Sequence, residues 1–297
     1  MCIRDSVDRF LDIAGSLSVS NGHSIEIENL LPTFTGDIEL DGGTIAGDSS
    51  IRFSGSVNVT TESVLRTNDF ESFQEGVEVN LQADLHLQGN GTLIFESANF
   101  AGEGALINDP GNLLLYLEDG VLGVDLVNRG SLNNPILLDI FQLLINGNVE
   151  NSGVINLQVE GTDPQLYDRL IVTNQFISNS GTFNIFIESD FKPLPGQQFD
   201  VLDFDSFVDN GVQFELQELW PGLEWDTSQF TTNGILRISG FLLGDVNQDG
   251  SVNLLDVAPF VELIQSGEYL AEADINQDGF VNLLDVSLFV ELVTQGY

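Results

Sequence analysis

Two near-copies of one stretch, DVNQDGSVNLLDVAPFVELIQSG at 245–267 and DINQDGFVNLLDVSLFVELVTQG at 274–296, decide the fold of the C-terminal part of the chain. Aligned without a gap, the copies agree at 16 of 23 positions. Each copy begins with twelve residues that place Asp or Asn at positions one, three, five, nine and twelve and Gly at position six. This spacing is typical of a calcium-binding loop, because a hard cation needs about six to eight oxygen ligands that converge on one point.

The spacing predicts the ligands of two Ca²⁺ ions. They are the side chains at positions one, three, five and twelve, the backbone carbonyl at position seven, and the side chain at position nine directly or through water. In the first copy these are Asp245, Asn247, Asp249, Ser251, Asn253 and Asp256, and in the second Asp274, Asn276, Asp278, Phe280, Asn282 and Asp285. Ordinary surface turns are rich in the same residues. The metal interpretation is favoured because the pattern occurs twice in register and each copy leads into an apolar helical pattern.

A helix is predicted after each loop, because the apolar residues that follow recur with helical periodicity. They are Leu254, Leu255, Val257, Phe260, Val261 and Ile264 in the first copy, and Leu283, Leu284, Val286, Phe289, Val290 and Val293 in the second. One copy alone could not bury its apolar face, so we expect the two helices to pack face to face. No helix of comparable length is predicted before either loop.

Duplicated loop-helix segments with Asp at position twelve resemble dockerin modules, and the resemblance covers about Leu243 to Tyr297. It implies a small secreted calcium-dependent docking module, which in the best-known members anchors polysaccharide-degrading enzymes to a cohesin partner. The sequence departs from cohesin-binding members at loop positions ten and eleven, where they have polar residues and this chain has leucines. The basic residues expected further along the helix are also absent. The resemblance therefore implies calcium binding more directly than a cohesin-like partner.

Charge excludes two classes of partner. The chain has 46 acidic and 8 basic residues, a net charge of −38, and Lys192 is its single lysine. Such a charge repels nucleic acids and anionic membrane surfaces. No stretch approaches the roughly 20 apolar residues of a membrane-spanning helix, so we expect no membrane insertion. Cys2 is the only cysteine, which excludes an intrachain disulfide.

Residues 10–161 alternate apolar and polar side chains in short runs that Gly, Asn, Asp or Ser interrupt every few residues. This pattern predicts a mainly β body of many short strands. We favour a right-handed parallel β-helix (β-solenoid), in which inward Val, Leu and Ile form ladders. Tandem β-sandwiches are the alternative.

Residues 162–240 are richer in Phe and contain both Trp residues. The segments YDRL, PGQQF and WDTS resemble the closing part of autotransporter-like passenger domains and related surface proteins. That resemblance implies that 162–240 form the terminal coils and cap of the solenoid, followed by the calcium module at 241–297. Residues 1–9 fit no pattern that follows, and we expect them to be an extraneous or truncated start.

No catalytic residue is predicted. Tyr167, Asp168 and Arg169 are interpreted as an Arg-Asp pair at a strand start beside a core tyrosine, and Asp203 and Asp205 as solvated acids. Calcium loops of this kind are saturated outside cells, so the chain is expected to be a non-catalytic extracellular or cell-surface protein. The alternative is a component of a polysaccharide-degrading system: a truncated polysaccharide lyase or glycoside hydrolase, or a glycan-binding scaffold, recruited through the dockerin-like module.

Overall fold

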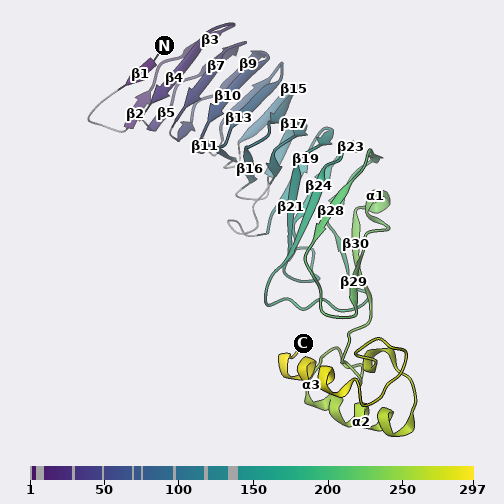
Figure 1. Cartoon of the computed structure of the whole chain (residues 1–297). Helices are drawn as coiled ribbons and strands as arrows, with labels where there is room; N and C mark the ends of the chain where they lie inside the picture. Colours follow the sequence, from purple (N-terminus) through teal and green to yellow (C-terminus); the bar gives the residue numbers. More distant parts are fainter. Residues whose placement is uncertain are drawn as a thin grey trace.

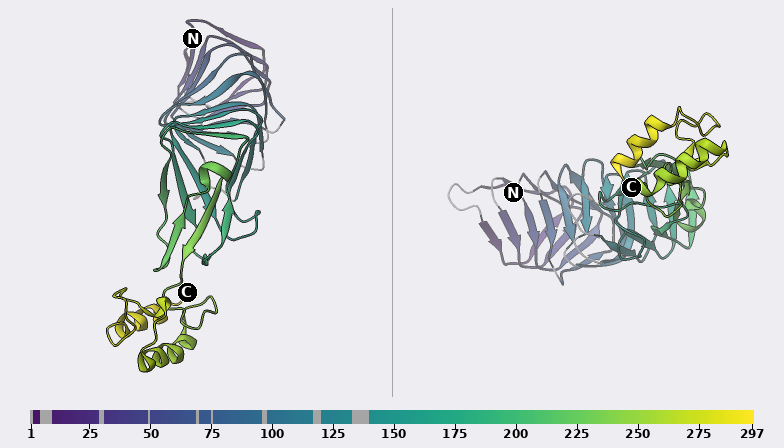
Figure 2. Two further views of the ribbon diagram at one scale, coloured as in Figure 1. Left: turned by 90° about the vertical axis from the view of Figure 1, so that its right-hand side faces the viewer. Right: turned by 90° about the horizontal axis from the view of Figure 1, so that it is seen from below.

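The computed structural model describes residues 2–4, 10–28, 31–48, 50–68, 70–74, 76–95, 98–116, 120–132 and 140–297. Strands follow one another along the body, and a small helical module lies beyond the last of them (Figure 1). Two further views place the module at the same end of the body (Figure 2). The prediction of a mainly β protein with a small helical C-terminal region is confirmed.

The body consists mostly of two sheets, in which every pairing between described strands is parallel. The larger sheet contains β1 Cys2–Arg4, β3 Leu17–Ser20, β4 Ser24–Glu28, β6 Ile38–Asp41, β7 Thr44–Gly47, β9 Val57–Thr61, β10 Ser63–Thr67, β12 Glu78–Leu81, β13 Leu85–Gly89, β15 Asn99–Asn108, β17 Gly120–Asn128, β19 Gln142–Ile145, β20 Val149–Asn151, β22 Arg169–Val172, β23 Gln175–Ser178, β26 Leu202–Asp203 and β27 Ser206–Asp209. The smaller sheet contains β2 Phe10–Ile13, β5 Leu31–Phe34, β8 Ile51–Phe53, β11 Phe70–Phe73, β14 Thr92–Phe95, β16 Leu113–Tyr116, β18 Ser131–Leu132, β21 Val154–Val159, β24 Thr182–Ile187 and β28 Gln213–Leu216.

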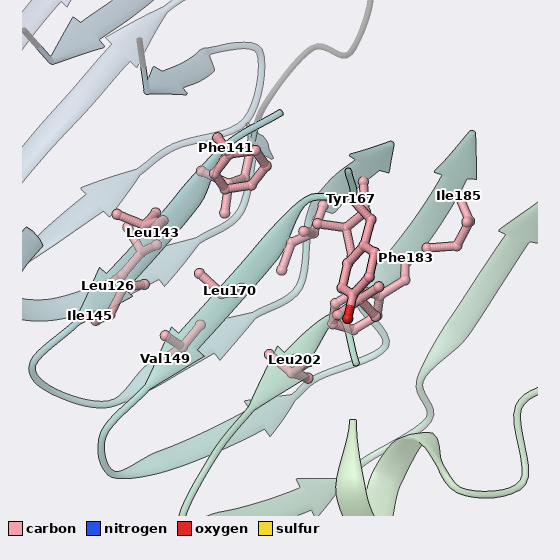
Figure 3. Close-up of a cluster of buried hydrophobic side chains, with 14 of the residues drawn as sticks. Leu126, Phe141, Leu143, Ile145, Val149, Tyr167, Leu170, Phe183, Ile185 and Leu202 are labelled. Atoms are coloured by element: carbon pink, nitrogen blue, oxygen red, sulfur yellow. The ribbon is translucent and has the colours of Figure 1, made fainter. Parts of the chain in front are cut away.

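The register of the parallel strands stacks apolar residues in lines, because every second side chain of a strand points to the same face. One such line runs through Leu17, Ile38, Val57, Val79, Phe100 and Leu122. In the smaller sheet the rings of Phe34 and Phe53 stack with centroids 5.5 Å apart, and those of Phe53 and Phe73 at 4.8 Å. Figure 3 shows side chains from several strands that meet in the interior, among them Leu143, Leu170 and Leu202.

A line of buried asparagines also follows the stack. Asn108 donates from Nδ2 to Asn128 Oδ1, and Asn128 donates to Asn151 Oδ1, each at 2.8 Å. The partners are 20 and 23 residues apart in sequence. Buried amides need hydrogen-bond partners, and the parallel register supplies an identical amide one strand further on.

The parallel stacking ends after β27 and β28. A separate three-stranded antiparallel sheet is made of β25 Gln198–Asp200, which precedes these strands in the chain, and of β29 Leu223–Asp226 and β30 Ile235–Gly240, which follow them. Helix α1, Phe230–Asn233, inserts the fully buried Phe230 beside Phe183 and Phe214, with ring centroids 4.6 and 4.9 Å away. Tandem β-sandwiches are not supported, because antiparallel pairing between described strands is confined to this small sheet.

The C-terminal module contains η1 Leu254–Asp256, α2 Val257–Ser266, η2 Ala271–Ala273 and α3 Val286–Gln295. The predicted helix after each loop is confirmed, although the α-helical part begins only at loop position thirteen. The rings of Phe260 and Phe289 stack at 3.9 Å between the two helices, as expected for helices that pack face to face. At the other end of the chain, β1 pairs with β4. The prediction that residues 1–9 are an extraneous or truncated start stays a prediction, and residues 5–9 lie outside the described part.

Candidate metal centre

Two aspartates close the first twelve-residue loop, residues 245–256, hereafter loop 1. Asp245, at position one, accepts hydrogen bonds from the N–H groups of Asp249 at 3.0 Å and Gly250 at 2.9 Å. Asp256, at position twelve, accepts from the N–H groups of Asn247 at 3.0 Å and Asn253 at 2.8 Å. Both carboxylates are buried, and their hydrogen bonds tie position one to position five and position twelve to positions three and nine.

Two further side chains of loop 1, Asn247 and Asp249, also accept hydrogen bonds from its backbone. Asn247 Oδ1 accepts from Asp249 N at 3.0 Å, and Asp249 Oδ1 accepts from Ser251 N at 3.0 Å. Gln248 and Gly250 have φ angles of 58° and 86°. The left-handed conformation at these two positions curls the chain, and glycine adopts it at little cost.

The second loop, residues 274–285 and hereafter loop 2, repeats this hydrogen-bond set. Asp274 accepts from Asp278 N at 3.1 Å and Gly279 N at 2.9 Å. Asp285 accepts from Asn276 N at 3.0 Å and Asn282 N at 2.9 Å. Gln277 and Gly279 have φ angles of 59° and 90°. Two separate copies of the pattern therefore fold into one geometry.

The donor set of both loops fits Ca²⁺. Each loop offers three carboxylates, two side-chain amides and a backbone carbonyl, which are the hard oxygen ligands that calcium prefers. Residues 241–297 contain no Lys or Arg, and no ion pair between described residues neutralises a loop carboxylate. Burial raises the pKa of Asp245, although the N–H groups of Gly250 and Asp249 act in the opposite direction. A divalent cation would supply the missing positive charge.

The carboxylates do not by themselves form a metal-binding cluster. Within the part of the chain that the structure describes, no three or more His, Cys, Asp or Glu residues are grouped so as to hold a metal ion. Two of the five side-chain positions in each loop are asparagines, and the aspartate oxygens accept backbone N–H groups. The individual ligand assignments therefore stay predictions.

The leucines at loop positions ten and eleven are solvent exposed, contrary to the expectation that they belong to a buried helix face. Leu254 is 80% exposed and Leu283 is 76% exposed, and Leu255 and Leu284 are exposed as well. Leu254 and Leu255 lie in the 3₁₀ turn η1, and Leu283 and Leu284 lie in the turn before α3, where the chain has not yet begun its α-helix. Beside them, an apolar groove of about 210 Å³ lies between α2 and α3, lined by Leu254, Val257, Phe260, Val261, Ile264, Val286, Phe289, Val290, Val293 and Thr294.

Tyr167, Asp168 and Arg169 have structural contacts, but the predicted pairing between them needs correction. Arg169 Nη2 contacts Asp200 at 2.6 Å and Asp203 at 2.5 Å, so its partners come from the next strands. Asp168 is buried and accepts the N–H groups of Phe141 and Gln158. Asp203, interpreted from the sequence as a solvated acid, is therefore an ion-pair partner.

Sequence analysis missed a charged cluster around His86. Its ring nitrogens lie 2.9 Å from Asp109 Oδ2 and 3.1 Å from Glu62 Oε1, and Arg129 contacts Asp109 Oδ1 at 3.1 Å. Burial tends to raise the pKa of Asp109, but hydrogen bonds from His86, Gln88 and Arg129 lower it overall. The cluster joins neighbouring strands of the larger sheet. His86 and Asp109 are 23 residues apart, which is close to the sequence distance between paired strands. This spacing is the only sequence signal for the cluster.

Comparison with protein families agrees with this geometry. Residues 243–291 match the model of the dockerin type I domain. The suspected dockerin module is thereby confirmed, and such a domain is itself non-catalytic. The comparisons with curated proteins and with solved structures each gave no match. Among the described residues, no helix has the length and apolar character needed to cross a membrane.

Proposed function

We propose that this chain is a non-catalytic extracellular or cell-surface protein whose C-terminal module binds two Ca²⁺ ions and docks onto a protein partner. The observation that carries the proposal is the repetition, in loops 1 and 2, of one ligand pattern with one set of hydrogen bonds. The dockerin match supports it, because dockerin domains bind calcium and cohesins and are typically extracellular or at the cell surface.

The body serves, in this proposal, as a right-handed β-solenoid shaft that carries the module. The parallel registers support this architecture, since successive strands align inward side chains of the same kind. The buried asparagine line and the stacked phenylalanines are further support, because repeated stacking of equivalent positions produces such ladders. Phe230 and the antiparallel sheet would close the last coil as its cap.

Calcium would be held by Asp245, Asn247, Asp249, Ser251, Asn253 and Asp256 in loop 1, and by Asp274, Asn276, Asp278, Phe280, Asn282 and Asp285 in loop 2. The ion neutralises three carboxylates in each loop, which otherwise repel one another. The chain's own contribution is to hold Asp245 and Asp256, or Asp274 and Asp285, in place through backbone N–H groups. The left-handed residues at positions four and six curl the backbone of each loop.

The exposed leucines supply the docking surface. Leu254 and Leu255 occupy loop positions ten and eleven of the first copy, and Leu283 and Leu284 the same positions of the second. Contiguous exposed apolar surface marks interaction sites, and Leu254 adjoins the apolar groove between α2 and α3. A cohesin-like partner for this module would therefore present an apolar surface to these positions.

Calorimetric titration of the full chain with Ca²⁺ tests the calcium site. We expect two bound ions per chain, and no binding at either loop after substitution of Asp249→Ala together with Asp278→Ala. In chelator, the circular dichroism spectrum should lose the helical signal of the module and keep the β-strand signal of the body. A helical signal that does not change with chelator would contradict the proposal.

A role in a polysaccharide-degrading system is the second candidate, and the dockerin match is the observation that favours it. In that case the body would bind a glycan or be part of a carbohydrate-active enzyme. A pull-down with a panel of cohesins, with and without chelator, separates the candidates. Calcium-dependent capture by a cohesin from a polysaccharide-degrading complex favours the second candidate, whereas no capture by the panel favours docking onto a different protein partner. Turnover of pectin, alginate or glucan that one carboxylate substitution abolishes would overturn the non-catalytic assignment.

A further inference from the structure

Tyr297, which follows α3, contacts both the module and the body. Its backbone forms two hydrogen bonds with Val252 of loop 1: Val252 N to Tyr297 O at 3.3 Å, and Tyr297 N to Val252 O at 3.2 Å. Val252 is fully buried at position eight of the loop. Through its main chain, Tyr297 is therefore attached to the loop that is expected to bind the first Ca²⁺ ion.

The side chain of Tyr297 extends into the body. Its hydroxyl donates to the carbonyl oxygen of Pro193, and its ring packs on Trp220 with centroids 5.0 Å apart. Lys192 Nζ lies 5.4 Å from the centre of the tyrosine ring and donates to Gly296 O at 3.2 Å. Lys192 is the only lysine of the chain, and it lies where the body meets the module.

Trp220 fixes the connecting segment at the same place. Its Nε1 donates to Leu243 O at 2.9 Å, and Leu243 N donates to Pro221 O at 3.1 Å. A Cβ atom placed on Gly250 of loop 1 would lie 3.5 Å from Leu194 Cδ1, which shows that the body comes close to loop 1. At Gly279, the same position of loop 2, no atom lies within 4 Å of such a Cβ.

We propose that Tyr297 is a clasp that couples Ca²⁺ binding in loop 1 to a fixed orientation of the module on the body. The inference rests on the proposed calcium function. When loop 1 is ordered by its ion, Val252 is in place to hold Tyr297, and Tyr297 is in place against Pro193 and Trp220. Without the ion, loop 1 loses its shape, the clasp opens, and the module moves independently of the body. Because coupling is reciprocal, the clasp in turn strengthens calcium binding.

Fluorescence of Trp220 in the full chain tests this coupling, with Trp225→Phe as the background that leaves one tryptophan. In this background, chelator should shift Trp220 emission to longer wavelength, and added Ca²⁺ should restore it. With Tyr297→Ala in addition, the emission should start at the longer wavelength and lose its calcium response. Calorimetry on the same variant should still find two ions, one of them bound roughly fivefold or more weakly. Gln295→Ala, an exposed neighbour on α3, is the matched control and should behave as the background.

A variant on the body side tests the same coupling in case Tyr297→Ala prevents the module from folding. Lys192→Ala removes a body side chain that contacts Gly296 and Tyr297 and leaves every module residue unchanged. It should reduce the Trp220 response while two ions remain bound. Two outcomes would contradict the coupling through Tyr297 and leave the calcium function in place. In the first, two ions bind and the module folds, but Trp220 emission does not respond to Ca²⁺. In the second, the Tyr297→Ala variant keeps the full response. If no Ca²⁺ binds to the background protein, both proposals are overturned.

Discussion

Loops 1 and 2 have nearly the same sequence and the same internal hydrogen bonds, but they lie in different surroundings. Loop 1 has the body beside it, with Leu194 close to Gly250 and Tyr297 bonded to Val252. Loop 2 is open at the equivalent glycine. Position seven follows the same division: it is the partly buried Ser251 in loop 1 and the exposed Phe280 in loop 2. Local sequence thus sets the shape of each loop, and the rest of the chain sets what each loop contacts.

Removal of a central ligand should have the largest effect on the module. Asp249→Ala and Asp278→Ala each delete a carboxylate at position five and leave a loop with too little charge to hold its ion. We expect either variant to weaken calcium binding strongly and the double variant to unfold residues 245–297, as measured by circular dichroism with and without Ca²⁺. Asp205→Ala, at an exposed aspartate of the body, is the control. Single variants that both keep two tightly bound ions would contradict the assigned ligands.

Truncation of the stacked aromatic pair should come next. Phe260→Ala and Phe289→Ala each leave a cavity between α2 and α3, at a cost of about 3–5 kcal/mol. The two losses should be similar, because the two rings stack on each other and are both buried. Thermal unfolding of the calcium-loaded full chain, followed by the helical signal, measures both. A clearly smaller loss for one ring would show that the two halves of the module are stabilised independently.

High pH should weaken the contact that only loop 1 has. Burial raises the pKa of Tyr297 to about 12 from the ordinary value of 10.0. The docked phenol keeps its proton in this range whereas the undocked phenol releases it, so rising pH favours undocking between about pH 10 and 12. Trp220 emission in the Trp225→Phe background measures this. Tyr297→Phe has no phenol to ionise, so the part of the pH dependence that comes from Tyr297 should disappear. Any pH dependence of Trp220 emission that remains in this variant comes from other groups.

Exchange of the exposed leucines should change stability least. Leu255→Ser and Leu284→Ser alter side chains that pack on little of the protein, so the free energy of unfolding should change by no more than about 0.5 kcal/mol. Binding to a captured partner should nevertheless weaken, and the ratio of the two effects indicates which loop faces that partner. An equal loss of stability and of binding would show that these leucines are structural.

The loops were predictable from the sequence because their geometry is local. Asp, Asn and Gly at fixed spacing determine which N–H groups each carboxylate accepts. The alternating pattern of the body likewise predicted short strands. The exposure of Leu254 and Leu283 was not predictable from helical periodicity, because Leu254 lies in a 3₁₀ turn and Leu283 in a hydrogen-bonded turn, each ahead of the α-helix. The contact of Tyr297 with Pro193 joins residues 104 apart, and a single sequence gives no signal for such a distant pair.

The parallel register of the body also determines how its length can change. Each parallel strand finds its partner 18 to 32 residues later, and the steps at Asn108, Asn128 and Asn151 are 20 and 23 residues. If one such segment were inserted or lost, the strands on either side would still pair in the same parallel way. The body would become longer or shorter by one strand spacing, about 4.8 Å. The reach between the two ends could therefore be adjusted in small equal steps by duplication, with neither end rebuilt.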